Sequence, residues 1–62
     1  MTEKEQRLAD CKSEYRLNST MAQKAFVEND TWNYEYYGDL AHTWANEGIR
    51  IANELGEEWN EQ

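Results

Sequence analysis

The chain of 62 residues has no proline, three glycines, one cysteine and one histidine. Because glycine occurs only as Gly38, Gly48 and Gly56, few positions can interrupt a long helix. A single cysteine, Cys11, cannot form an intrachain disulfide, and Cys11 with His42 cannot supply the four ligands of a structural zinc site. We therefore expect neither a cross-link nor a metal to stabilise the fold.

Long apolar runs are also lacking. No stretch approaches the roughly 20 apolar residues that span a bilayer, and the first residues, Met-Thr-Glu-Lys-Glu-Gln-Arg, do not resemble a signal peptide. We expect a cytoplasmic protein without membrane contact. A chain this short buries roughly 60% of its unfolded surface, which leaves little net stability. With disulfides and metals excluded, self-association into a homodimer is the expected source of further stability.

Basic residues are scarce in the second half. Residues 28–62 contain nine acidic side chains and one basic side chain, Arg50, whereas residues 1–27 contain four acidic and five basic side chains. The net charge is −7 at pH 7. Nucleic acids and anionic membranes both require a basic surface, so direct binding to either is not expected. A basic protein is the expected partner.

The second half carries the clearest periodic pattern. Apolar residues recur at intervals of three and four, which predicts an amphipathic helix; they are Tyr34, Tyr37, Ala41, Trp44, Gly48, Ile51, Ala52, Leu55 and Trp59. Gly48 on this stripe would let a helix or a large ring approach closely. Gly56 is expected to end or fray the helix, with Trp59 folding back.

The first half also predicts a helix, over about residues 3–28. Thr2 and Glu5 have the spacing of a capping box at its start. Residues 18–20 could break this helix, but the strong helix formers that follow them favour continuity. If the helix is continuous, Leu17 and Met21 form a second apolar strip.

Residues 28–31 have the composition of a turn, and Asp30 or Thr31 can cap the next helix. We expect that helix to cover about residues 32–58. An alternative begins it at Asp39 and leaves residues 32–37 as an aromatic loop.

Two helices of matched length with a short connection predict an all-α antiparallel helical hairpin, as a single domain over residues 1–62. The single interface between two helices, the seam, cannot bury three Trp, four Tyr and one Phe. We therefore expect the hairpin to dimerise into a four-helix bundle. The predicted core and dimer interface are Leu8, Tyr15, Ala22, Phe26, Trp32, Tyr37, Trp44, Ile51 and Leu55. For Trp32, Tyr34 and Tyr36, dimer seam and partner contact both remain open.

Candidates for chemistry are few. We interpret Cys11 as a buried apolar residue and His42 as a partly exposed helix residue. Asp39 and His42 imitate the Glu-x-x-His spacing of metal-binding bundles, but the pattern turns Asp39 outward. We expect no enzyme activity, no metal site and no cofactor.

The acidic side chains of the second helix are the predicted partner-binding surface. They lie opposite its apolar stripe in the helical pattern and comprise Glu35, Asp39, Glu47, Glu54, Glu57, Glu58 and Glu61. One interpretation is a nucleic-acid mimic that occupies the basic groove of a DNA-binding or RNA-binding protein. The other is a solvated face that only confers solubility.

In size, acidity, Trp and Tyr content and lack of catalytic residues, the whole chain resembles the small early accessory proteins of temperate, lambdoid-type bacteriophages. The resemblance is one of overall character and transfers no functional residue. It implies a non-enzymatic regulator or inhibitor that binds a host protein in the host cytoplasm. The alternative is a structural or oligomerisation module.

Overall fold

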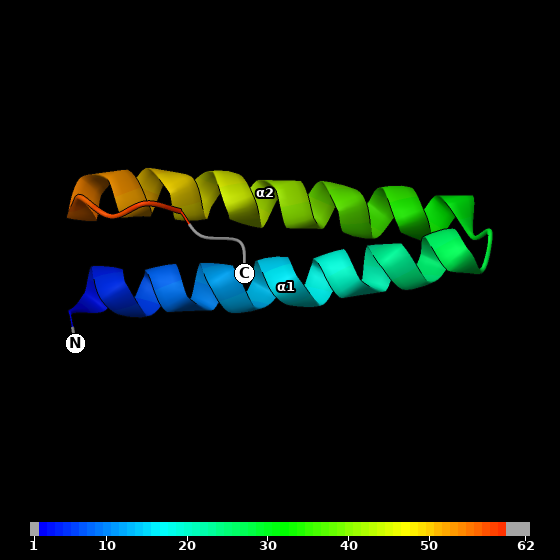
Figure 1. Cartoon of the computed structure of the whole chain (residues 1–62), viewed down its shortest axis with the longest axis horizontal. Coiled ribbons are helices and arrows are strands. Elements are labelled where there is room, and N and C mark those ends of the chain that lie inside the picture. The colour runs from blue at the N-terminus through cyan, green and yellow to red at the C-terminus, as the bar shows by residue number, and fades with distance from the viewer. Residues whose placement is uncertain (1, 60–62) are drawn as a thin grey trace.

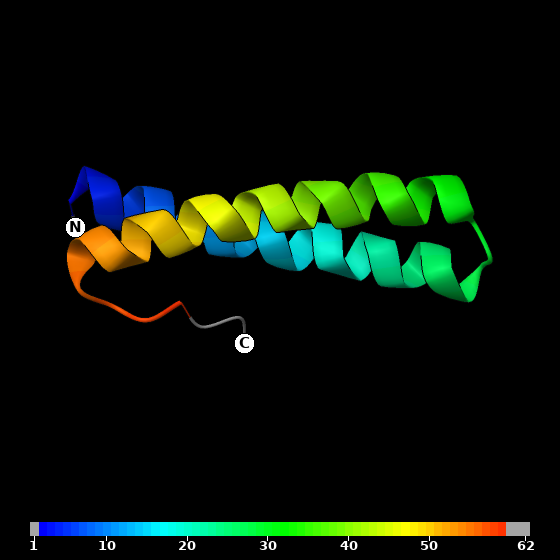
Figure 2. The same cartoon turned by 90° about the horizontal axis from the view of Figure 1, so that it is seen from above.

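The structure, a computed structural model, describes residues 2–59. Within these residues the chain forms two helices, α1 (Glu3–Val27) and α2 (Thr31–Leu55), and no strand. The helices run antiparallel and side by side along their length (Figure 1, Figure 2). The antiparallel helical hairpin expected from the sequence is therefore confirmed. Neither helix in this part of the chain combines the length and apolar character needed to cross a membrane.

Helix α1 begins at the predicted capping box. The N–H of Glu5 donates to the Thr2 hydroxyl at 3.1 Å, and the N–H of Thr2 donates to the Glu5 carboxylate at 2.8 Å. The hydrogen bonds from the Thr2 backbone and hydroxyl hold the pKa of Glu5 below its usual value. Two of the first unsatisfied N–H groups are thereby paired, which fixes the start of the helix.

Residues 18–20 do not interrupt α1. The side chain of Asn18 donates to the carbonyl of Glu14 at 2.8 Å, and the hydroxyl of Thr20 donates to the carbonyl of Arg16 at 2.9 Å. These polar side chains bond to carbonyls four residues earlier and leave the helix intact. The expected continuity is confirmed.

The connection spans residues 28–30. Asn29 adopts the left-handed conformation, with φ 59°, which Asn tolerates better than most residues. The N–H of Asp30 donates to the carbonyl of Ala25 at 2.8 Å, and the carboxylate of Asp30 accepts from the N–H of Asn33 at 3.2 Å. Because this cap starts α2 at Thr31, the alternative of an aromatic loop before Asp39 is wrong.

Gly56 ends α2 in the left-handed conformation, with φ 73°. The N–H of Glu57 donates to the carbonyl of Ala52 at 2.9 Å, as in a glycine-capped helix end. The helix therefore stops at Leu55, three residues before the expected end at 58. Residues 57–59 turn back along α2 (Figure 1), as the sequence predicted, and bring Trp59 onto Gly48.

The two ends of the hairpin are packed differently. We call residues 2–16 and 43–59 the open half and residues 17–42 the turn half. In the open half, Leu8, Cys11, Ile51 and Ala52 form a buried cluster, against which the half-buried side chains of Trp44, Leu55 and Trp59 pack. In the turn half, the buried apolar residues are alanines, namely Ala22, Ala25 and Ala41.

The predicted core residues differ in burial: some are buried, some half-buried and two exposed. Leu8, Ala22 and Ile51 are buried, whereas Tyr15, Tyr37, Trp44 and Leu55 are half-buried. Phe26, which was expected inside, has 65% of its surface exposed in this hairpin. Trp32, for which dimer seam and partner contact were both open, has 70% exposed, and this exposure fits either role. The buried residues of α1 near the turn are Ala22 and Ala25, and Phe26 follows Ala25 by one position, so its side chain points about 100° away from that of Ala25. Phe26 packs instead against Tyr34, and Trp32 against Tyr36, outside the seam.

Candidate functional site

Ion pairs join the helices in the open half. Glu47 accepts from Arg7 of α1 at 3.1 Å and also pairs with Arg50, while Glu54 lies 3.6 Å from Lys4 and 3.1 Å from Arg50. The hydrogen bond from Arg50 to Glu47 raises the pKa of Arg50 further above its usual value. Two carboxylates of the predicted partner surface therefore have cationic neighbours within the chain.

The geometry of α2 explains this placement. Twelve residues separate Glu35 from Glu47, which is about 120° around a helix at about 100° per residue. Glu47 and Glu54 consequently lie on the flank that meets the basic side chains of α1. The ion pairs thus divide the predicted acidic face into carboxylates with cationic neighbours, Glu47 and Glu54, and carboxylates without an ion pair to another described residue, Glu35 and Asp39.

The C-terminal acids Glu57 and Glu58 are separate from the ion-paired Glu47 and Glu54 and from Glu35 and Asp39. Glu57 and Glu58 are exposed and lie beyond the end of α2, in the segment that turns back at Gly56. Glu61 lies outside the described residues. Of the predicted surface, only Glu35 and Asp39 remain on the outward part of α2 without an ion pair to another described residue.

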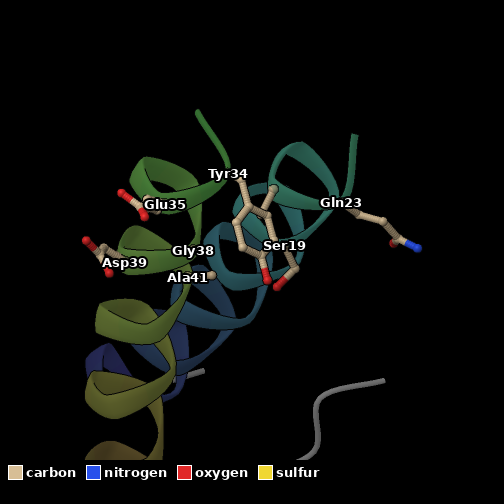
Figure 3. A pocket seen from close by; sticks show the side chains of 8 residues that line it. Ser19, Gln23, Tyr34, Glu35, Gly38, Asp39 and Ala41 are labelled. Atoms are coloured by element: carbon tan, nitrogen blue, oxygen red, sulfur yellow. The ribbon is translucent and has the colours of Figure 1, made fainter. Parts of the chain in front are cut away.

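Glu35 and Asp39 border a groove between the helices in the turn half. Figure 3 shows the ring of Tyr34 over the groove, and both carboxylates projecting from the side of α2 that faces away from Tyr34 and Ser19. Its volume is about 610 Å³, and its walls are Ser19, Ala22, Gln23, Tyr34, Glu35, Gly38, Asp39 and Ala41. Small side chains form the floor, so an incoming segment could approach the backbones closely.

The turn half also exposes most of the large apolar side chains. Exposed apolar residues in this half are Leu17, Phe26, Val27, Trp32, Tyr34 and Tyr36, whereas the open half has Ile49. The rings are ordered by mutual contact: Trp32 stacks on Tyr36 with centroids 5.3 Å apart, and Phe26 lies 5.5 Å from Tyr34. An aromatic surface of this kind is typical of protein interfaces.

The two candidates for chemistry lie apart in the fold. Cys11 is buried in the open half, where burial and then the charge of Glu47 raise the pKa of its thiol. A thiol held in this form is a poor nucleophile at neutral pH. His42 is exposed on α2 in the turn half. Within residues 2–59, no three His, Cys, Asp or Glu side chains converge as metal ligands.

Sequence reasoning missed the ion pairs between the helices, although the turn position contains a signal for them. Residues 4 and 54 are each 25 positions from Asn29, so an antiparallel hairpin centred there places Lys4 opposite Glu54. The register of the turn, applied to the charged residues, would have shown which acids face α1.

Comparison with known proteins adds no assignment: the chain matches no protein-family model, no curated protein and no solved structure.

Proposed function

We propose that this protein is a non-enzymatic binding module that docks a basic protein partner on its turn half. Glu35 and Asp39 provide the charge, and the adjoining groove with Tyr34 provides the apolar contact. One observation carries the proposal: exposed aromatic rings and acids without ion pairs to other described residues occur together in this half.

The aromatic contacts favour binding because they order the surface before a partner arrives. Trp32 and Tyr36 are already stacked, and Tyr34 already packs on Phe26. Ordering side chains on association opposes binding, so a surface that is ordered beforehand binds more tightly. Tyr and Trp are also the side chains that most often dominate interface energies.

The charges select the kind of partner. Glu35 and Asp39 lie one helical turn apart, about 6 Å between their Cβ atoms. Together with the net charge of −7, they attract Lys-rich and Arg-rich surfaces and repel acidic ones. Because Glu47 and Glu54 have internal partners, a local acidic and aromatic patch fits the structure better than a long nucleic-acid mimic.

The setting that we propose is a phage-encoded accessory protein in the host cytoplasm, which regulates or inhibits a host protein by occupying its basic surface. Acidity, small size and the content of Trp and Tyr support this setting.

The test uses a basic amphipathic helical peptide, with Lys and Arg on one face and Leu on the other, and follows Trp fluorescence. The double variant Glu35→Lys/Asp39→Lys should weaken binding at least tenfold, about 1.4 kcal/mol. The variant Glu57→Lys/Glu58→Lys changes the net charge equally but lies in the open half, and it should retain most of the affinity. Equal losses in both variants would show that only net charge matters and would overturn the proposed site.

Salt provides a second readout. Raising the salt concentration from about 50 mM to about 500 mM should weaken peptide binding, because exposed charges are screened. An affinity that does not change over this range would remove the electrostatic mechanism.

A second candidate function is an oligomerisation module. The stacked Trp32 and Tyr36 lie on the outer surface of α2, where a second copy could cover them and complete a four-helix bundle. Two chains of charge −7 repel each other, so salt should strengthen self-association while it weakens binding of the basic peptide. Sedimentation of the wild type and of Trp32→Ser/Tyr36→Ser at both salt concentrations separates the two functions.

A further inference from the structure

Trp59 occupies a socket formed by both helices. Its indole lies on Gly48 of α2, where an added Cβ would be 2.7 Å from Cη2 and 2.8 Å from Cε3 of the ring. Tyr15 of α1 meets the same indole edge to face, with centroids 5.7 Å apart and planes at 80°. The socket therefore requires a residue without a side chain at position 48, and it accepts a large aromatic ring.

Trp59 is an imperfect occupant of this socket. Its indole nitrogen Nε1 is buried and has no hydrogen-bond partner among the described residues. Buried Trp N–H groups normally have an acceptor, because leaving one unpaired is unfavourable. The segment that carries Trp59 is also non-helical after Gly56, with Glu57 and Glu58 exposed. An occupant that brought its own acceptor would fit the socket better.

The socket and the groove of the turn half are built from the same two helices. On α2, small residues recur at helical spacing from the groove to the socket, as Gly38, Ala41, Ala45 and Gly48. On α1, Tyr15 of the socket and Ser19 of the groove lie one turn apart on the same side. Ten residues separate Gly38 from Gly48, or about 15 Å along the helix axis.

We propose that Trp59 is an internal competitor that closes this socket in the unbound protein, and that an aromatic side chain of the partner displaces it. The partner segment would be a helix lying in the groove, with basic residues beside Glu35 and Asp39 and an aromatic residue about ten positions away, in the socket. The placement of the basic residues rests on the proposed function, whereas the exchange of aromatic rings rests on the socket alone.

The socket is tested first with N-acetyltryptophanamide, a probe without charge. Trp59→Ala should bind the probe, detected as NMR shifts at Tyr15 and Gly48, whereas the wild type should not. Adding Gly48→Ala to Trp59→Ala fills the socket with a Cβ and should abolish this binding. The proposal is overturned if Trp59→Ala, shown to be folded by circular dichroism, does not bind the probe.

Competition is tested with a basic helical peptide that carries one Trp ten positions from its Lys/Arg cluster. Trp59→Ala should bind this peptide about tenfold tighter than the wild type, because the closed state no longer opposes binding. The same peptide with Ala in place of its Trp should bind both proteins equally. If Trp59 is only structural, its removal would weaken binding or leave it unchanged, and the proposal would be wrong.

Two further variants keep the outcome interpretable. If Trp59→Ala does not fold, Trp59→Phe retains a smaller ring and should still bind the Trp peptide more tightly than the wild type; no gain would overturn the proposal. Glu35→Lys/Asp39→Lys, added to Trp59→Ala, should remove peptide binding and leave N-acetyltryptophanamide binding unchanged. If Trp59→Ala binds N-acetyltryptophanamide but neither it nor the wild type binds the basic peptide, the proposed function has failed. If the peptide binds but N-acetyltryptophanamide does not, the socket proposal has failed.

Discussion

The two halves of this hairpin have the same secondary structure but different contents. The open half contains the buried cluster around Leu8 and Ile51 and all four ion pairs found among the described residues. The turn half has an alanine seam, exposed rings and acids without ion pairs in the described part of the chain. The buried cluster and the surface that we propose for recognition thus lie at opposite ends of one pair of helices.

The energetic contrast follows from side-chain size. Burying a Leu or Ile side chain stabilises a fold by about 1.5–3 kcal/mol, whereas one methyl group contributes about 0.8 kcal/mol. Leu8 and Ile51, which are 4% and 2% exposed, therefore contribute more per residue than the alanines of the turn half. The turn half depends more on its caps and on the continuity of its helices.

The largest expected effect is in the open half. Ile51→Ala should lower the free energy of unfolding by about 2–5 kcal/mol, because it leaves a cavity in the buried cluster. Phe26→Ala removes a larger side chain in the turn half, but one that is 65% exposed, and should change stability by less than about 1 kcal/mol. Urea unfolding followed by circular dichroism measures both. Equal losses would show that a second chain covers Phe26 in solution and would break the contrast between the halves.

The next comparison uses one glycine from each half. Gly48→Ala should be less stable than Gly38→Ala by about 1–3 kcal/mol, because its Cβ would overlap the Trp59 ring. Gly38→Ala should stabilise the protein by about 0.5–1 kcal/mol, because no atom lies within 4 Å of the added Cβ and Ala favours helix. Thermal unfolding shows whether each variant has a higher or a lower melting temperature than the wild type. A stabilised Gly48→Ala would mean that Trp59 does not occupy the socket in solution.

Local signals in the sequence predicted most of the hairpin. The Thr2 and Glu5 spacing identified the start of α1, and the turn residues identified the start of α2. The place of Gly48 on the apolar stripe also predicted the close approach of a helix or a large ring, and the ring of Trp59 lies there. These features depend on neighbours in the chain or on helical periodicity, so one sequence is sufficient to recognise them.

The surface was less predictable because it depends on the distance and register between the helices. Periodicity assigned Phe26 to the interior, but it does not show that the seam follows Ala22 and Ala25 and leaves Phe26 65% exposed. Periodicity also grouped Glu47 with Glu35, although α1 provides a cation at only one of these positions. Both errors concern side chains whose position is decided by the other helix.

A smaller effect should distinguish the carboxylates of the two halves. Glu47→Gln weakens an ion pair to α1 and should lower stability by about 0.2–1 kcal/mol at low salt, as for other exposed pairs. Glu35→Gln has no such pair to lose and should leave stability unchanged or raise it slightly by reducing the net charge. The difference should shrink in high salt. A persistent loss in Glu35→Gln would reveal a contact that the single hairpin lacks.

The smallest effect concerns the outermost turn of the open half, at the Glu5 cap. Hydrogen bonds from Thr2 lower the pKa of Glu5 in the folded protein, so the folded carboxyl releases its proton more easily than the unfolded one. Its contribution to stability is therefore present above the ordinary pKa of 4.5 and is lost as the pH falls through the lower, folded value. The NMR shift of the Thr2 amide should report this loss with a midpoint below 4.5. Glu5→Gln, which can still cap, should remove the titration and retain the helix start. A midpoint at or above the ordinary value would show that the cap is frayed in solution, and the ordered part of the open half would then begin closer to Leu8.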